Sequence, residues 1–202
     1  MSFKCNDCNY VASQKGNLDR HIKAVHDKIK DIKCLIKQYL NNQAIFFIDV
    51  GANIGSISIP VSSMGVQSVA IEPSKFNYDK LLRNVDRNQS NLFTRKIALV
   101  SELTKGKEIA LFSPPGNYGS SSFSPEWNPG LTENLIEFVE TCTLDALVEE
   151  IGSKLIDKLL IIKIDVEGAE LNVLRGAQVC LRHAKYVIVE VNNDINCEKF
   201  GY

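Results

Sequence analysis

The sequence lacks the features that direct a chain into a membrane or out of the cell. No apolar run approaches the roughly 18 residues that a membrane-spanning helix needs, and the N-terminus has no signal-peptide pattern. A disulfide framework is absent too, because only Cys5 and Cys8 of the six cysteines are closely spaced. We therefore expect an intracellular protein, in the cytoplasm or the nucleus, with no membrane partner.

A strong charge of one sign is also missing. The 202 residues have a formal net charge of −1, and 45% of them are hydrophobic, which is enough for one ordinary domain plus a small module. The charge is unevenly spread: residues 1–40 carry 8 Lys and Arg against 4 Asp, and the rest carries 15 against 20 acidic residues. The basic N-terminus suits nucleic acid, although a solvated Lys-rich helix explains residues 28–37 equally well.

The first module contains a metal-ligand pattern. Cys5, Cys8, His21 and His26 follow the spacing C-x2-C-x12-H-x4-H, which suits tetrahedral Zn²⁺ held by thiolates and imidazoles. The pattern predicts two short strands and a helix from about residue 15 to 25, folded by a structural zinc ion. Residues 3–26 resemble a Cys-Cys-His-His zinc finger, a small ββα unit. We assign residues 1–27 to this finger.

The resemblance implies three base-reading side chains, which are Gln14, Asn17 and Arg20. Their preferences for adenine, adenine and guanine predict the triplet 5′-GAA-3′. One finger covers only about three base pairs, so binding to protein, nonspecific binding to RNA and a tethering role remain alternatives. Residues 28–43 then predict a connecting helix whose apolar stripe packs on the next domain.

A nucleoside-binding unit follows in the domain of residues 44–202. An apolar run at residues 45–50 predicts a buried strand. Gly51 and Gly55 predict a tight turn after it, whose backbone a ligand can approach. Glu72 is placed to accept hydrogen bonds from ribose hydroxyls. Asp49 precedes the turn, and its charge would repel a pyrophosphate by about 4 kcal/mol at ~4 Å. S-adenosyl-L-methionine, which has no phosphate and carries a cationic sulfonium, fits better.

Strand and helix patterns alternate through the rest of the chain, which predicts a parallel sheet with helices on both faces. We expect strands at residues 45–50, 68–71, 91–100, 107–112, 159–164 and 186–191. We expect helices at 56–63, 75–88, 141–150 and 168–181, with Thr143 as the cap of the third. The helix at 56–63 should be short or irregular, and Leu81, Leu82 and Val85 should form the inner face of the helix at 75–88. Ligands of such sheets bind at the carboxyl ends of the strands. That edge collects Asp49, Glu72, Ala98, Asp165 and Glu190.

Five segments of this domain resemble the FkbM-type methyltransferases. They are Asp49–Gly55, Ile71–Pro73, Thr143–Asp145, Ile162–Glu170 and Val189–Val191. The resemblance implies a Rossmann-like class I methyltransferase fold of α/β class that uses S-adenosyl-L-methionine, and in several members methylates a hydroxyl of a sugar or secondary metabolite. It implies that Asp49, Gly51, Ala52, Asn53 and Gly55 line the methionine side of the cofactor and that Glu72 holds the ribose. The resemblance also implies that the 165–167 segment faces the methyl group and the acceptor.

Transfer to a hydroxyl also needs a proton acceptor within about 3 Å. We rank Asp165 first because it ends a rigid strand, followed by Glu167 and then Glu190. The methyl acceptor itself is not identified by the sequence.

Eleven residues follow Val191, too few for the two strands, one of them antiparallel, with which class I methyltransferases usually end. The sequence therefore predicts a fragment whose sheet lacks its last strands, a homodimer across the strand at 186–191, or a catalytically impaired enzyme. Three functions stay open: a methyltransferase carrying a zinc finger, a nucleic-acid-binding protein that retains a catalytically impaired methyltransferase fold, and a dehydrogenase-like protein. Intact Asp49 and Glu72 favour the first.

Overall fold

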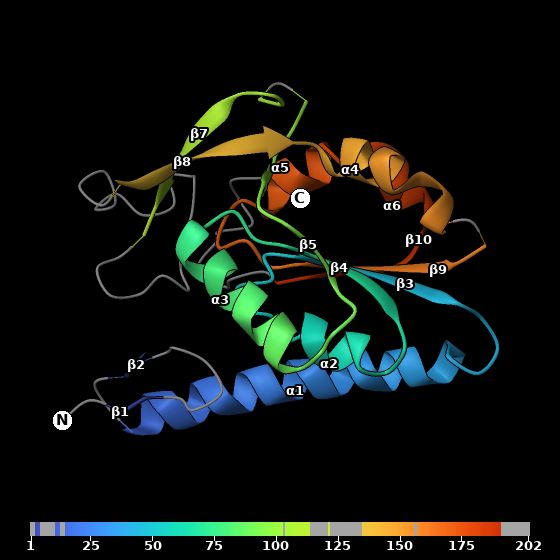
Figure 1. Cartoon of the computed structure of the whole chain (residues 1–202), viewed down its shortest axis with the longest axis horizontal. Coiled ribbons are helices and arrows are strands. Elements are labelled where there is room, and N and C mark those ends of the chain that lie inside the picture. The colour runs from blue at the N-terminus through green and yellow to red at the C-terminus, as the bar shows by residue number, and fades with distance from the viewer. Residues whose placement is uncertain are drawn as a thin grey trace, which may run out of the picture.

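The computed structural model describes the backbone of residues 3–4, 11–12, 15–102, 104–113, 121, 135–155 and 157–190, and side chains from residue 27 onward except 135 and 136. The centre of the molecule is a five-stranded parallel sheet in the order β10-β9-β3-β4-β5 (Figure 1). Its strands are β3 (Ile45–Val50), β4 (Gln67–Ile71), β5 (Phe93–Arg95), β9 (Leu159–Ile164) and β10 (Ala184–Val189). This confirms the α/β, Rossmann-like fold.

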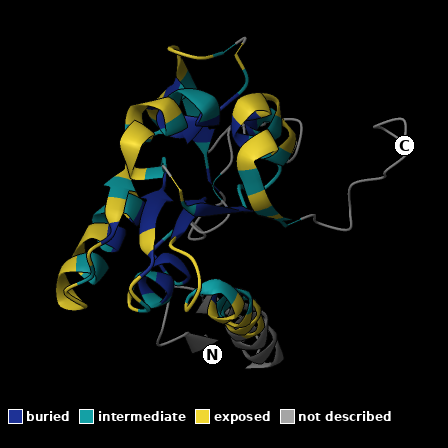
Figure 2. Ribbon diagram, turned by 90° about the vertical axis from the view of Figure 1, so that its right-hand side faces the viewer, coloured by how far each residue is buried: buried dark blue, intermediate teal, exposed yellow. Residues whose placement is uncertain are grey.

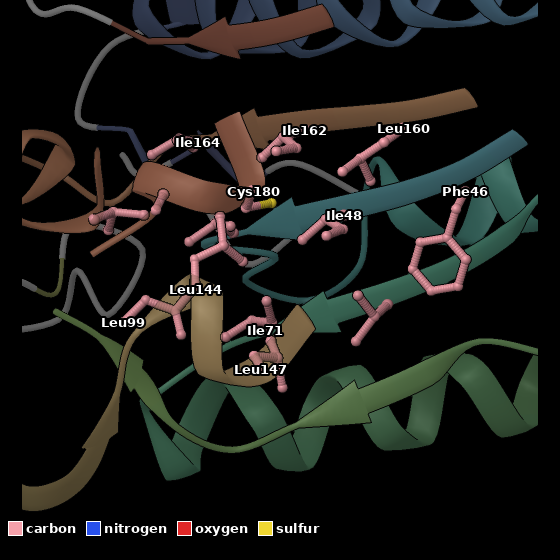
Figure 3. Packing of buried hydrophobic residues seen from close by; sticks show 14 residues of the cluster. Phe46, Ile48, Ile71, Leu99, Leu144, Leu147, Leu160, Ile162, Ile164 and Cys180 are labelled. Carbon is pink, nitrogen blue, oxygen red and sulfur yellow. The ribbon is translucent and has the colours of Figure 1, made fainter. Parts of the chain in front are cut away.

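The central strands are apolar because both of their faces are covered. All six residues of β3 and all six of β9 are buried. One face packs against α1 (Lys15–Tyr39), α2 (Ser58–Ser62) and α3 (Lys75–Arg87). The other packs against α4 (Leu144–Ile151), α5 (Glu170–Arg175) and α6 (Gln178–His183), with a 3₁₀ turn at Gly152–Leu155 after α4 (Figure 3). Buried residues line the sheet, and the outer faces of the helices are exposed (Figure 2).

The N-terminal segment is a hairpin followed by a long helix. Strands β1 (Phe3–Lys4) and β2 (Val11–Ala12) pair antiparallel, with Phe3 opposite Ala12, so the backbone order is ββα. The two helices expected at 15–25 and 28–43 are one uninterrupted helix, α1. Its apolar stripe packs on the sheet as expected, because Ile32 and Ile36 are buried against residues of β3 and β9.

A smaller second sheet corrects the predicted strand at 91–100. That segment divides into β5, in the parallel sheet, and β6 (Ala98–Leu99), which pairs with β8 (Leu135–Cys142). Strand β7 (Glu108–Phe112) pairs antiparallel with β8, giving the order β6-β8-β7. Strand β8 was not predicted. The two strands separate because residues 96 and 97 carry the chain out of the first sheet.

The predicted helix at 168–181 is two helices, α5 and α6. They are separated at Gly176, where a Cβ atom would lie 2.0 Å from the carbonyl oxygen of Val100. Asp145 then caps α6, since its carboxylate accepts hydrogen bonds from the amides of Val179 and Cys180 at 2.7–3.1 Å. Thr143, as expected, caps α4 by accepting from the Ala146 amide at 3.1 Å.

On α3, Leu81 is fully buried, whereas Leu82 is 42% exposed and does not belong to the inner face as predicted. Val85 packs beside Leu81 as predicted, and Tyr78, not Leu82, is the third inner-face residue. Among the described residues, no helix is both long and apolar enough to cross a membrane.

Candidate active site

The turn after β3 is held between the ends of its two neighbouring strands. The amides of Gly51 and Ala52 donate to the carbonyl oxygen of Ile71 at 3.0 and 2.9 Å. Gly51 has a φ of +76°, and a Cβ atom there would lie 1.8 Å from the carbonyl oxygen of Asp165. Only glycine therefore allows the ends of β3, β4 and β9 to meet this closely.

Gly55 has a different role from Gly51. With a φ of +88°, its nearest neighbours would be the side chains of Leu81 and Ile59, at 2.7 and 2.8 Å from an added Cβ. Close packing of α2 and α3 on the turn explains this glycine. Ala52 is buried in the same cluster, and Asn53 between them has a φ of 52°.

Glu72, directly after β4, is fixed by the turn. One carboxylate oxygen accepts the Asn53 amide at 2.9 Å, and the other accepts the Ser74 amide at 3.0 Å, with the Asn77 side-chain amide at 3.5 Å. A carboxylate has about four acceptor positions, so one remains for a ligand hydroxyl. Burial raises the pKa of Glu72 to about 7, and the two backbone hydrogen bonds oppose that rise.

Asp49 is completely buried behind the turn. Its carboxylate accepts a hydrogen bond from the Ser58 hydroxyl, and its Oδ1 atom lies 3.0 Å from Nζ of Lys163. Lys163 also donates to the carbonyl oxygen of Gly51 at 3.0 Å. Burial acts to lower the pKa of Lys163, but Asp49 and Asp165 outweigh it and the pKa is raised. The charge of Asp49 is thus compensated inside the protein.

Asp165 and Glu190 stand side by side, at the ends of β9 and β10. Asp165 Oδ2 lies 3.5 Å from Nζ of Lys163 and 3.6 Å from Nζ of Lys28, and Lys28 also donates to Glu190. Burial acts to raise the pKa of Asp165, but Lys163, Glu190 and Lys28 together lower it. The pKa of Glu190 is raised, by burial first and by Asp165 second.

Glu167 occupies a strained turn beside this pair. It has a φ of 54°, and Gly168 follows with a φ of 96°. Glu170 shapes the turn by accepting from the amides of Val166 and Gly168 at 3.1 and 3.2 Å. Burial, followed by repulsion from Asp165 and Glu190, raises the pKa of Glu167 to about 7. A carboxylate with such a pKa is a suitable proton acceptor near neutral pH.

The structure brings together most, but not all, of the residues predicted for the site. Strands β3, β4, β9 and β10 bring the turn, Glu72, Asp165, Glu167 and Glu190 to one edge of the sheet. Ala98 belongs to β6 of the second sheet, where it is 1% exposed and packs with Leu111 and Val139. Cys5, Cys8 and Gln14 lie outside the described residues. Asn17, Arg20, His21 and His26 lie on α1, but the structure does not describe their side chains.

Three residues of the site were not predicted: Lys28, Ser58 and Lys163. A lysine inside the otherwise apolar strand Leu159–Ile164 was a signal for Lys163, because a buried ammonium needs an anionic partner. Ser58 and Lys28 gave no such signal, since hydroxyls and lysines are ordinary on helices.

A glycine turn follows the central strand of the parallel sheet, and an acidic residue from the next strand is hydrogen-bonded to it, an arrangement typical of α/β proteins that bind nucleosides. Family comparison is more specific. The model of the Methyltransferase FkbM domain matches residues 49–201, which is most of the chain. The chain therefore belongs to the FkbM methyltransferase family. The model of the C2H2-type zinc-finger domain matches residues 3–28.

Two curated relatives are methyltransferases. "Hexuronic acid methyltransferase AglP" of Haloferax volcanii is 31% identical over 148 residues, which is 73% of this chain and 56% of the relative. "Methyltransferase sdnD" of Sordaria araneosa is 26% identical over 155 residues, covering 65% of this chain and 60% of the relative. The chain thus spans somewhat more than half the length of each.

Proposed function

We propose that this chain is an S-adenosylmethionine-dependent methyltransferase that methylates an oxygen, most simply a hydroxyl, of its acceptor. The observation that carries the proposal is Glu72, a buried carboxylate tied to the Asn53 and Ser74 amides beside the Gly51 turn. Its remaining acceptor position suits a ribose hydroxyl. The family match supplies the reaction class.

The charges at this edge favour a cationic ligand. The two ammonium groups there, of Lys28 and Lys163, are paired with only some of the carboxyl groups. The carboxyl groups are those of Asp49, Glu72, Asp165, Glu167 and Glu190. Because Asp49 is paired with Lys163, the excess of acidic groups resides on Glu72, Glu167 and the Asp165–Glu190 pair. A sulfonium gains from these groups and a pyrophosphate is repelled by them.

The chain's own residues have three tasks in the reaction. When bound, S-adenosylmethionine supplies an activated methyl group with a good leaving group, so the protein mainly aligns the reactants. Glu72 holds the ribose. Glu167 accepts the proton of the acceptor hydroxyl, because its pKa of about 7 suits the task better than the lowered pKa of Asp165. Asp165, the first choice from sequence, shapes the field around Glu167.

A methyl-transfer assay tests the proposal. Methyl-labelled S-adenosylmethionine and the full chain are mixed with glucuronic-acid oligosaccharides, chosen because one relative is named a hexuronic acid methyltransferase, and with cell-lysate fractions before and after nuclease treatment. We expect label in one of these acceptors, lost in Glu72→Ala and reduced at least about a hundredfold in Glu167→Gln. A folded chain that binds no S-adenosylmethionine and labels none of these acceptors would support the nucleic-acid-binding alternative.

For the N-terminal motif we propose a zinc-bound finger that directs the enzyme to nucleic acid, supported by the family match at residues 3–28 and the basic charge of residues 1–40. Site selection with the full chain and random duplexes should enrich 5′-GAA-3′, and Arg20→Ala should lose the guanine preference. Enrichment of unrelated triplets, or of none, would reject this role and leave protein binding or tethering.

A further inference from the structure

Lys28 enters the site from outside the family domain. It lies on α1, 21 positions before the start of the family match at residue 49. Its ammonium donates to Glu190 and lies 3.6 Å from Oδ2 of Asp165, so it bridges the carboxylates that end β9 and β10.

The position of Lys28 is set by packing along α1. Ile32 and Ile36, one and two turns further along the helix, are 4% and 0% exposed against the sheet. Beyond them, the hydroxyl of Tyr39 is hydrogen-bonded to that of Tyr186 on β10, and their ring centroids are 5.8 Å apart. The helix is therefore fixed on β10 at both ends of this stretch, with Lys28 over Glu190 at one end and Tyr39 over Tyr186 at the other.

We propose that Lys28 is a positioning residue of the methyl-transfer site, holding Asp165 and Glu190 together from the helix that leaves the zinc-finger motif. This inference rests on the function proposed above. The same uninterrupted helix carries His21 and His26, so the finger motif and the site share one rigid element.

The charges around the pair explain why a cation is needed there. Asp165 and Glu190 face each other, and both repel Glu167 in the turn before α5. Lys163 faces the pair from β9, but Asp49 and the Gly51 carbonyl also bind its ammonium. Lys28 is thus the cation, among the described residues, that reaches Glu190. Without Lys28 the carboxylates of Asp165 and Glu190 repel each other, and Glu190 loses the ion pair that fixes its side chain near Glu167.

The test uses the full chain as wild type, Lys28→Met, Lys28→Arg and Lys37→Met. Lys37 is exposed on the same helix and controls for loss of a helical lysine. Carboxyl ¹³C NMR follows the titration of Glu190, assigned with Glu190→Gln. In Lys28→Met we expect its midpoint to move to higher pH, and in Lys28→Arg to return toward wild type. Lys37→Met should titrate as wild type does. Thermal unfolding of each variant confirms that the fold is retained.

The second readout separates positioning from binding. We expect Lys28→Met to lower kcat about tenfold or more, with unchanged affinity for S-adenosylhomocysteine. An unmoved Glu190 titration in folded Lys28→Met would overturn the ion-pair bridge. A moved titration with wild-type kcat would overturn the positioning role. The NMR titration needs no methyl acceptor, so it tests the ion-pair bridge even if the proposed function is wrong. A wrong proposed function would be recognised separately, because the wild-type chain would then transfer no methyl group.

Discussion

At the scale of single residues, Glu72 meets two requirements at once. Its carboxylate fixes the turn after β3 through the Asn53 amide, and the same group is poised to accept a ligand hydroxyl. Burial raises its pKa to about 7, which means that ionising Glu72 inside the protein costs free energy. A bound ligand that donates a hydrogen bond to the carboxylate lowers that cost. The contribution of this group to folding stability is fully present below its ordinary pKa of 4.5 and is lost as pH rises through about 7.

The first prediction concerns the pH dependence of cofactor affinity. Ribose hydroxyls donate to ionised Glu72, so the affinity for S-adenosylhomocysteine should fall as pH drops below about 7, by up to tenfold per pH unit. In Glu72→Gln the affinity at pH 8 should be roughly 10- to 100-fold weaker, with the dependence near pH 7 removed. Calorimetric titration from pH 5.5 to 8.5 measures both. Glu149→Gln, at an exposed position on α4, is the control. A wild-type affinity for S-adenosylhomocysteine that does not change with pH would contradict the role of Glu72.

Gly51 gives the second prediction, through a matched pair of glycines. Gly51 and Gly106 have nearly the same φ, +76° and +75°, but a Cβ at Gly106 meets nothing within 4 Å. Gly106→Ala should therefore cost only the left-handed backbone penalty of about 1–2 kcal/mol. Gly51→Ala adds the clash with the Asp165 carbonyl and should cost at least about 1–3 kcal/mol more, with loss of cofactor binding. Urea unfolding compares the two, and equal costs would show that the ends of β3 and β9 separate easily.

At the scale of elements, α1 is part of the core of the enzyme domain as well as the helix of the finger motif. Ile36 is completely buried between α1 and the sheet, in a cluster with Phe47 and Ile161. Ile36→Ala should lower the free energy of unfolding by about 2–5 kcal/mol in a single cooperative transition. Cys34→Ala, at an exposed position on the same helix, should change it by less than about 0.5 kcal/mol. A loss of helix signal without loss of sheet stability would show that α1 folds independently.

The elements that the sequence predicted best are those whose burial is decided locally. Strands β3 and β9 are buried on both faces and are therefore continuous apolar runs, and their expected bounds agree with the structure. Elements decided by distant contacts were predicted poorly. The break between α5 and α6 depends on Gly176 meeting Val100, and β8 was missed because Phe138, at 60% exposure, disturbs its alternation.

The same distinction applies to the site. The rule that ligands bind at the carboxyl ends of parallel strands predicted Glu72, Asp165 and Glu190, which the structure brings to one edge. Lys28, which pairs with Asp165 and Glu190, could not be predicted, because it is 137 positions from Asp165 along the chain and resembles the other lysines of α1. Ala98 was placed at this edge only because one strand was expected where the chain forms two.

At the scale of the whole molecule, α1 joins the finger motif to the parallel sheet (Figure 1). We expect the full chain to bind about one Zn²⁺, measured by elemental analysis, and Cys8→Ala or His26→Ala to lose it. The sheet should survive removal of zinc by a chelator, because its core is formed by residues from 29 onward. Loss of the main unfolding transition on chelation would show that the metal stabilises the sheet as well, and stoichiometric zinc in Cys8→Ala would contradict the ligand set.

The crystal structure of the full chain grown with S-adenosylhomocysteine, and in parallel with NAD, tests the central claim most directly. We predict the sulfur compound at the ends of β3 and β4, with its ribose hydroxyls within about 3 Å of the Glu72 carboxylate, and no NAD at that place. NAD lying across the Gly51 turn, with S-adenosylhomocysteine absent or bound elsewhere, would contradict the account.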